Sequence, residues 1–167
     1  MAETTVLFPV TLPIAEALVA GDDVFTARYG MPVAPGYLDA PEVLPAVRDA
    51  LAAGAEPEWG SHLIVHRETI TVVGFGGYKG EPVDGEVEIG YSIAPDHRRR
   101  GHATAAVAQL VAGAAARGIE RVSAHTLAEE NPSTRILTRA GFVMTEAVPD
   151  EELGTVWRWE LRLDAGS

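Results

Sequence analysis

The chain has no cysteine among its 167 residues, which excludes disulfide bonds, a thiolate nucleophile and cysteine metal ligands. No apolar run approaches the roughly 20 residues that a membrane-spanning helix needs, so we expect no membrane association. The first residues, MAETTVLFPVTLP, lack the basic end and the long apolar core of a secretory signal peptide. We therefore expect a cytoplasmic protein.

Internal repeats, low-complexity tracts and long linkers are also missing, so a domain boundary has no place to fall. The hydrophobic content of 47% and the charged content of 22% are those of an ordinary globular protein. A chain of this length can bury a sizeable core. The sequence therefore predicts a single domain over residues 1–167.

The common nucleotide and metal motifs are absent. There is no GxxxxGK[ST] phosphate loop, and GFGGYKG at 74–80 fails the GxGxxG pattern and precedes a turn, so its glycines indicate a bulge or close strand packing. His62 and His66 lie four residues apart on a predicted strand without the HExxH pattern of a zinc site, so we expect no metal. His125, at the end of another predicted strand, indicates a structural or substrate-lining role rather than a catalytic one.

Negative charge dominates the chain, with a formal net charge of -11, and this argues against nucleic-acid binding. Residues 1–97 hold four basic and fifteen acidic side chains, whereas residues 98–145 hold seven arginines and three glutamates. An acidic first half beside a locally basic segment would suit a cationic substrate and an anionic cofactor. The alternative is that the acidic surface only keeps the protein in solution.

Hydrophobic periodicity predicts one α+β domain. Strands are predicted at residues 5–11, 61–66, 69–79, 86–93, 119–127, 142–148 and 154–163. Helices are predicted at residues 12–21, 40–54, 102–118 and 131–140, and residues 22–39 are expected to be irregular. The strand–helix–strand succession from 86 to 125 suggests a parallel crossover joined to an antiparallel meander.

Three consecutive arginines, Arg98 to Arg100, together with His102, stand where the third of these helices begins. A helix N-terminus already carries about half a positive charge and four unpaired N–H groups, so cations there have the wrong sign. A bound phosphate would remove the conflict, because it accepts backbone N–H groups and pairs with guanidinium groups. Gly101 lets the backbone approach such an anion, and Ala103 keeps the first turn clear. The alternative is a solvated surface patch.

The run from Arg98 to Ala103, RRRGHA, follows EIGYSIAPDH and fits the pattern [QR]-x-x-G-x-[GA]. With this signature the chain resembles the GCN5-related N-acetyltransferases, the GNAT superfamily. Its stretch AHTLAEENPSTRILTRAGF is similar to the branch that contains the N-terminal acetyltransferases of ribosomal proteins. The resemblance is clear over residues 60–163 and extends to the first 60 residues only in pattern.

This resemblance implies a mixed, mostly antiparallel twisted sheet with a parallel pair at its centre, flanked by about four helices. It also implies acetyl-CoA as co-substrate, with the pyrophosphate on the amides of residues 99–104. The pantetheine arm would run along the strand near Ser92 and Ile93, in a slot between splayed fourth and fifth strands. The cofactor-binding residues carried over are Ser92, Ile93, Arg98, Arg99, Arg100, Gly101, His102, Ala103, Thr104 and Asn131.

Acetyl transfer to an amine needs a neutral amine nitrogen. Alternation along residues 87–91 places Glu88 on the face opposite the apolar side chains, together with Glu86. The resemblance implies a carboxylate here that acts as a base, directly or through water, or that binds the amine. Glu86 is a weaker candidate, and an exposed strand carboxylate without a function is the alternative.

The departing thiolate needs a hydrogen-bond donor. Many members of the family place a tyrosine four residues before the glycine of Gly-Phe, but Leu137 occupies that position here. The ribosomal-protein branch implies a serine eight residues before that glycine, which is Ser133. An equally good interpretation is that Ser133 is the N-cap of the helix that follows, and both interpretations can hold at once. Asn131 stands two residues before Ser133, where the branch more often has a spacing of three.

The resemblance therefore implies direct acetyl transfer to a primary amine by an enzyme with Glu88 and Ser133 as catalytic residues. A non-catalytic module that keeps the acyl-CoA site is the alternative. The acceptor is open between a cationic one, such as a polyamine, an aminoglycoside or a basic peptide, and an uncharged amino acid or a protein N-terminus. Either a monomer or a homodimer is compatible with the sequence.

Overall fold

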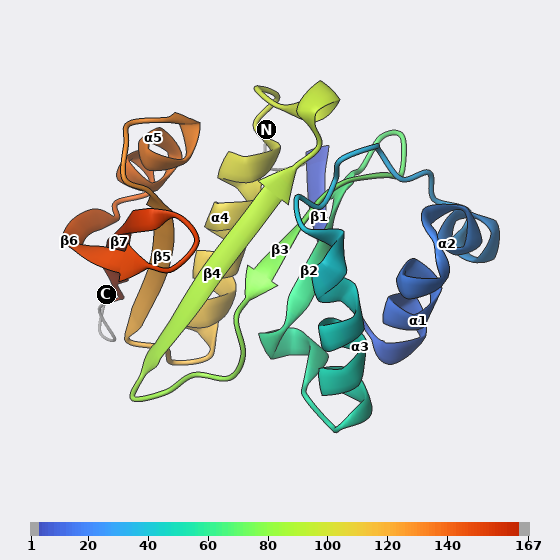
Figure 1. Cartoon of the computed structure of the whole chain (residues 1–167), viewed down its shortest axis with the longest axis horizontal. Helices are drawn as coiled ribbons and strands as arrows, with labels where there is room; N and C mark the ends of the chain where they lie inside the picture. Colours follow the sequence, from blue (N-terminus) through green and yellow to red (C-terminus); the bar gives the residue numbers. More distant parts are fainter. Residues whose placement is uncertain (1–3, 164–167) are drawn as a thin grey trace.

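The computed structural model describes residues 4–163, which form one seven-stranded sheet in the order β1-β2-β3-β4-β5-β7-β6 (Figure 1). All neighbouring strands are antiparallel except β4 and β5, which are parallel at the centre. The strands are β1 (Thr5–Pro9), β2 (Ser61–His66), β3 (Thr71–Tyr78), β4 (Glu86–Ile93), β5 (Arg121–Leu127), β6 (Val143–Asp150) and β7 (Gly154–Arg162). The predicted mixed sheet with one parallel pair is confirmed.

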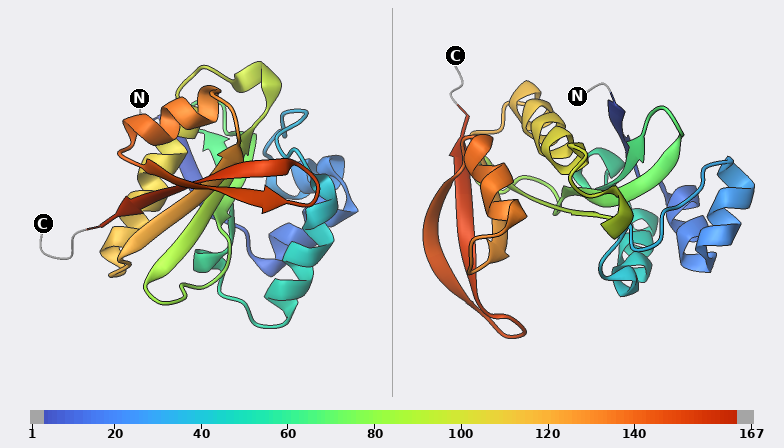
Figure 2. Two further views of the ribbon diagram at one scale, coloured as in Figure 1. Left: turned by 60° about the vertical axis from the view of Figure 1, so that its left-hand side comes forward. Right: turned by 90° about the horizontal axis from the view of Figure 1, so that it is seen from above.

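Five α-helices cover the two faces of the sheet within residues 4–163 (Figure 2). One face carries α1 (Leu12–Ala20), α2 (Asp22–Tyr29) and α3 (Leu44–Ala52), and the other carries α4 (His102–Ala116) and α5 (Pro132–Arg139). Leu63 and Phe75 point to the first group of helices, while Val87 and Ile89 point to α4. Each face therefore has its own hydrophobic core.

The helix α2 was not predicted, because residues 22–39 were expected to be irregular. Phe25 is its one buried residue among eight, so the apolar periodicity that identifies a helix is missing. The signals that favour this helix lie at its ends. Asp22 and Asp23 lie in its first turn, and Gly30 ends it in the left-handed conformation with φ 72°.

The glycines of β3 permit close strand packing, as the sequence predicted. A Cβ atom at Gly76 would lie 2.5 Å from the Gly90 carbonyl oxygen of β4, and one at Gly74 would collide with the Ser92 carbonyl. The opposite edge of β3 has a register shift against β2 between Ile64 and Val65. The two glycines let β3 lie close against β4, the strand that bears Glu88.

Among residues 4–163, no helix is both long and apolar enough to cross a lipid bilayer. The same part of the chain holds no group of three or more histidine, aspartate or glutamate side chains arranged to bind a metal ion.

Candidate active site

The two central strands separate partway along their length. The parallel ladder between β4 and β5 ends at the pair Ile89 and Ala124, although β4 continues to Ile93 and β5 to Leu127. Figure 1 shows the two strands diverging toward their C-terminal ends. Beyond Ile89 the edge of β4 that faces β5 is therefore open to another extended chain with amide groups.

The loop between β4 and α4 forms a cradle of backbone amides. Arg99 has φ 63° and Gly101 has φ 85°, both in the left-handed region. The first hydrogen bond of α4 runs from the Ala105 N–H to the Gly101 carbonyl, 2.9 Å, so the amides of Gly101 and residues 102–104 precede it. A Cβ atom at Gly101 would meet no atom within 4 Å. The cradle is open outward and fits a phosphate group.

The three arginines do not behave alike. Arg98 donates from Nε to the Ile93 carbonyl, 3.0 Å, and its Nη2 lies 3.9 Å from the Asp39 carboxylate. It therefore fastens the loop to the end of β4. Arg99 and Arg100 are exposed beside the amides, where their charges favour an anion.

His102 does not add a charge to this cradle, contrary to the suggestion from the sequence. Its ring is 2% exposed, and Nδ1 lies 2.8 Å from the Thr5 hydroxyl of β1. Burial lowers the pKa of His102, and the nearby His66, His97 and Arg100 lower it further. The imidazole is therefore an internal link to β1, and His102 offers the cradle its backbone amide.

The side chains of Ser92 and Ile93 are also committed within the protein. The Ser92 hydroxyl donates to the Tyr37 carbonyl, 2.9 Å. The Ile93 side chain is 7% exposed and packs against Val73 and Ala106. At these two positions only the backbone is left to contact a cofactor arm, and the Ile93 carbonyl already accepts from Arg98.

Glu88 lies on the face opposite α4, as strand alternation predicted, and its carboxylate receives two partners. Oε2 is 3.0 Å from Nδ1 of His125 on β5 and 3.1 Å from Nζ of Lys79, which directly follows β3. The side chains of Glu88 and His125 are 30% and 31% exposed. This cluster therefore lies at the surface of the sheet within reach of solvent.

Glu86 has a different environment. Burial acts to raise the pKa of Glu86, but hydrogen bonds from Arg158 and Arg121 outweigh it and lower that pKa. The Arg158 Nη2 donates to Oε2 at 2.8 Å, and the Arg121 Nε donates to Oε1 at 3.3 Å. Glu86 is therefore held as an ion pair, which leaves Glu88 as the better candidate for proton transfer.

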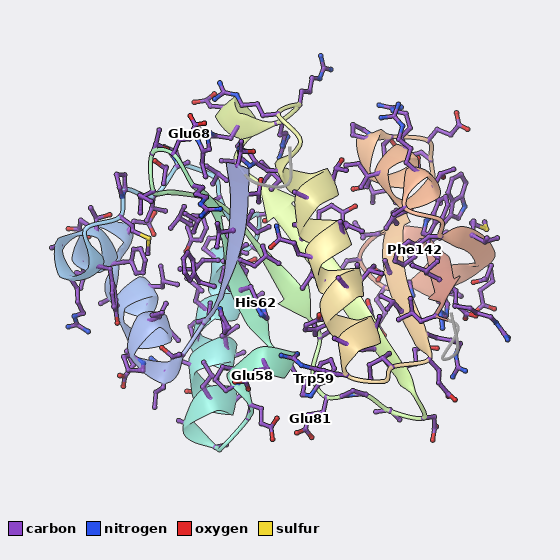
Figure 3. The ribbon with its side chains drawn as sticks, turned by 180° about the vertical axis from the view of Figure 1, so that it is seen from behind. Glu58, Trp59, His62, Glu68, Glu81 and Phe142 are labelled. Carbon is purple, nitrogen blue, oxygen red and sulfur yellow. The ribbon has the colours of Figure 1, made fainter. Side chains whose placement is uncertain are left out.

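The first of two adjoining cavities lies beside these carboxylates. The first, of about 390 Å³, is lined by Lys79, Glu81, Val83, Asp84, Glu86, Val87, Glu88 and Arg121. The second, of about 300 Å³, lies between α3 and the end of β3, and Val47, Leu51 and Trp59 contribute to its apolar wall. Both cavities are lined by Lys79 and Glu81, and Trp59 and Glu81 are labelled in Figure 3.

Asn131, and not Ser133, caps α5, so the N-cap interpretation of Ser133 is wrong. The Asn131 Oδ1 accepts from the Thr134 N–H, 3.0 Å, and the Thr134 hydroxyl accepts from the Asn131 N–H, 3.0 Å. This reciprocal capping box follows from the extended backbone of Asn131, with φ -158°. The side-chain carbonyl of Asn131 is thereby used in the cap of α5. The Ser133 hydroxyl does not cap the helix.

Tyr91 of β4 is a candidate that the sequence analysis missed. It lies on the α4 side of the strand, and its hydroxyl donates to the Ser133 Oγ at 3.5 Å. Burial raises the pKa of Tyr91, against the opposing effect of the Ser133 hydrogen bond. Leu137, at the position where a phenol was sought, is 1% exposed in the core. The sequence analysis missed Tyr91 because it alternates with Val87 and Ile89 and was therefore taken as a core residue.

Known proteins with sequences similar to this chain are acetyltransferases. The sequence profile of the acetyltransferase (GNAT) domain matches residues 7–143. The uncharacterized N-acetyltransferase YjdG of Bacillus subtilis is 28% identical over 106 residues, 62% of this chain and 63% of that protein. Its counterpart YoaA is 32% identical over 85 residues, 50% of this chain and 47% of that protein. The alignments thus span about half to two thirds of these relatives.

Solved structures share the fold. The ribosomal L7/L12 alpha-N-protein acetyltransferase RimL in complex with coenzyme A has a TM-score of 0.70 at 17% identity, covering 97% of this chain and 96% of that one. The ribosomal-protein-S5-alanine acetyltransferase from Vibrio fischeri has a TM-score of 0.67 at 15% identity, covering 96% and 94%. YncA from Salmonella typhimurium, a putative acetyltransferase with acetyl-CoA, has a TM-score of 0.63 at 15% identity, covering 96% and 95%.

Proposed function

Because the chain belongs to the GNAT acetyltransferase family, we propose that it transfers the acetyl group of acetyl-CoA directly to a primary amine of a small molecule or of a peptide or protein N-terminus. One observation carries the proposal. The slot between β4 and β5 begins beside Glu88, after the pair Ile89 and Ala124, and β4 leads from there to the loop that forms the amide cradle. A thioester arm and an anionic pyrophosphate need these two features in this order.

The residues present fit acetyl-CoA, which supplies the acetyl group as an activated thioester. The amides of residues 99–104 would hold the pyrophosphate, with the Arg99 and Arg100 guanidinium groups assisting. The open edge of β4 beyond Ile89 would hold the pantetheine arm near Ser92 and Ile93. Asn131, at the start of α5, would contact the arm through its side-chain NH2 group, because the capping box uses only its Oδ1.

Two polar groups serve the chemistry from opposite sides of the sheet. Glu88 lies on the open face, where it stabilises the positive charge of the arriving amine and assists its deprotonation. Ser133, in contact with the Tyr91 phenol, lies on the α5 side and donates to the departing sulfur. This division places the acceptor and the leaving group on different faces of the slot.

The first cavity, which Glu88 lines, favours a cationic acceptor. Glu81, Asp84, Glu86 and Glu88 outnumber Lys79 and Arg121 in the lining of the first cavity, which produces a negative potential there. RimL and the Vibrio fischeri enzyme are named as acetyltransferases of ribosomal proteins, so peptide N-termini belong in the test panel beside polyamines and other amines. We expect the enzyme to act in the cytoplasm, as a monomer or a homodimer.

Binding and turnover test the proposal in turn. Acetyl-CoA should raise the melting temperature of the protein, since a ligand that binds only the folded state stabilises it. Release of free CoA should then appear with at least one member of a panel of polyamines, aminoglycosides, amino acids and peptides. No thermal shift and no competition with a CoA resin would contradict the proposal at its first step.

A non-catalytic module that only binds acyl-CoA is the second candidate function. Leu137 in place of the phenol and the commitment of Asn131 to the α5 cap favour it. Such a module would show the same rise in melting temperature with acetyl-CoA as the enzyme. The two separate at the CoA-release assay, where the module would give no amine-dependent CoA with any acceptor.

A further inference from the structure

His125 occupies a distinctive position on β5. The last β4–β5 pair joins Ile89 and Ala124, so His125 is the first residue of β5 beyond the ladder, at the mouth of the slot. Its Nδ1 lies 3.0 Å from the Glu88 Oε2, and its side chain is 31% exposed. The imidazole therefore stands between Glu88, the slot and solvent.

The contact with the Glu88 carboxylate determines the orientation and the tautomer of the His125 ring. A carboxylate that accepts from Nδ1–H holds the ring in one orientation and in the tautomer whose Nε2 carries a free lone pair. The Lys79 ammonium lies 3.1 Å from the same carboxylate oxygen. Glu88 also stabilises the imidazolium that forms when Nε2 takes a proton.

We propose that His125 is the general base of the acetyl transfer and that Glu88 is its positioning residue. The proposal rests on the acetyltransferase function proposed above. The Glu88 Oε2 has two partners, His125 and Lys79, so this oxygen holds the imidazole in place. As a class, free imidazoles have pKa values nearer to neutral pH than free carboxylic acids do. An imidazole is therefore the better general base near neutral pH.

The proton balance of this step is simple. The His125 Nε2 takes one proton from the ammonium of the acceptor and releases it to solvent. The freed nitrogen lone pair forms the C–N bond to the acetyl carbon while the C–S bond breaks. The second proton of that nitrogen ends on the departing sulfur, with the Ser133 hydroxyl next to it. The products are the amide, free CoA and one proton.

Other charged groups face the same surface. They are Lys79 after β3, Glu86 and Glu88 on β4, Arg121 on β5, Glu146 on β6, and Arg158, Glu160 and Arg162 on β7. Arg158, directly opposite His125 in the register, is paired with Glu86 at 2.8 Å and with Glu160 at 3.4 Å. Its charge is thereby offset, which leaves Glu88 as the carboxylate in contact with the imidazole.

The test uses His125→Gln in the full chain, because glutamine can still donate to Glu88 but cannot relay a proton. We expect kcat/KM at pH 7 to fall roughly 100-fold, with an unchanged acetyl-CoA dissociation constant and melting temperature. The wild-type profile of kcat/KM should show an acidic limb, and this limb should be lost in His125→Gln. Added imidazole should restore part of the activity of His125→Ala. Glu16→Gln, an exposed change on α1, serves as the control.

The outcomes separate the two levels of the account. An active wild type with a His125→Gln effect below about threefold and an intact acidic limb overturns the role of His125 alone. A wild type that binds acetyl-CoA but releases no CoA with any acceptor overturns the proposed function, and the role of His125 with it. A large loss in His125→Gln that comes with weaker acetyl-CoA binding and no imidazole rescue shows a structural role and overturns the proposal.

Discussion

Tyr91 of β4 and Ser133 of α5 bring their hydroxyl groups to within 3.5 Å of each other, with the tyrosine donating. The contact joins a residue of a strand to a residue of a helix 42 positions further along the chain. A phenol thus reaches the α5 side of the slot from the strand, while Leu137 fills the core. The pair forms one polar unit beside the expected position of the departing sulfur.

The Ser133 hydroxyl is expected to matter for turnover and not for binding. Ser133→Ala should lower kcat roughly 10- to 100-fold, the effect of losing one hydrogen bond to a developing charge, with little change in the acetyl-CoA dissociation constant. Tyr91→Phe should lower kcat less, and the double variant should resemble Ser133→Ala, because the tyrosine acts through the serine. Steady-state kinetics of the three variants check this. Full activity of Ser133→Ala would contradict the assignment.

The amide cradle is expected to depend more on Gly101 than on any one arginine. Gly101→Val places a β-branched residue at φ 85°, which strains the backbone by about 1–3 kcal/mol and projects a side chain into the open cradle. Binding of CoA, measured by calorimetry, should weaken at least tenfold, whereas Arg99→Ala or Arg100→Ala should weaken it up to about fivefold.

Gly118 offers a matched control for that substitution. It lies beyond the other end of α4 with φ 78°, and a Cβ atom there meets nothing within 4 Å. Gly118→Val should therefore reduce stability to a similar extent and leave CoA binding unchanged. A larger loss of CoA affinity in the arginine variants than in Gly101→Val would show that side chains, and not amides, hold the pyrophosphate.

The capping box of α5 predicts a contrast in stability. Asn131→Ala removes the side-chain acceptor of the Thr134 N–H and should lower the free energy of unfolding by about 1 kcal/mol. Ser133→Ala, two residues further on, should change it by less than about 0.5 kcal/mol. Urea unfolding of both variants measures the difference. The reverse order would return the cap to Ser133.

The pH dependence of stability follows from His102. Its pKa is lowered by burial and by the neighbouring histidines and Arg100, so the unfolded chain takes up a proton at a higher pH than the folded protein. The free energy of unfolding should therefore fall as the pH drops below about 6.5, where histidine in an unfolded chain titrates. Burial lowers the pKa of His62 too, with the same sign.

The variant His102→Asn isolates the contribution of His102, because asparagine can still bond the Thr5 hydroxyl without titrating. Its unfolding free energy, measured by denaturant titration at pH 8 and pH 5, should change less between the two pH values than that of the wild type. An identical pH dependence in both proteins would show that another group is responsible.

Local sequence patterns were sufficient for the framework of the site. Alternation in β4 placed Glu88 opposite Val87 and Ile89, and the arginine-glycine run located the start of α4. The pattern was weaker where apolar periodicity was missing, as in α2, where Phe25 is the one buried residue. It failed at the start of α5, where Ser133 was read as a possible N-cap although Asn131 forms the cap, because the choice depends on backbone angles.

The contacts that define the chemistry could not be predicted from local patterns. The pairs Glu88 with His125 and Tyr91 with Ser133 join residues 37 and 42 positions apart. The first depends on the register of a parallel pair and on where that pair ends. The inward turn of His102 similarly depends on Thr5, 97 residues away. Such contacts depend on how whole strands and helices pack together. The local spacing of residues in the sequence does not reveal this packing.

The most direct test of the account is mass spectrometry of acceptor amines incubated with the protein and acetyl-CoA, together with measurement of free CoA. The account predicts that one acceptor gains an acetyl group in equal amount to the CoA released, and that Glu88→Gln reduces both while still binding acetyl-CoA. Free CoA without an acetylated acceptor, or bound acetyl-CoA with neither product across the panel, would contradict it.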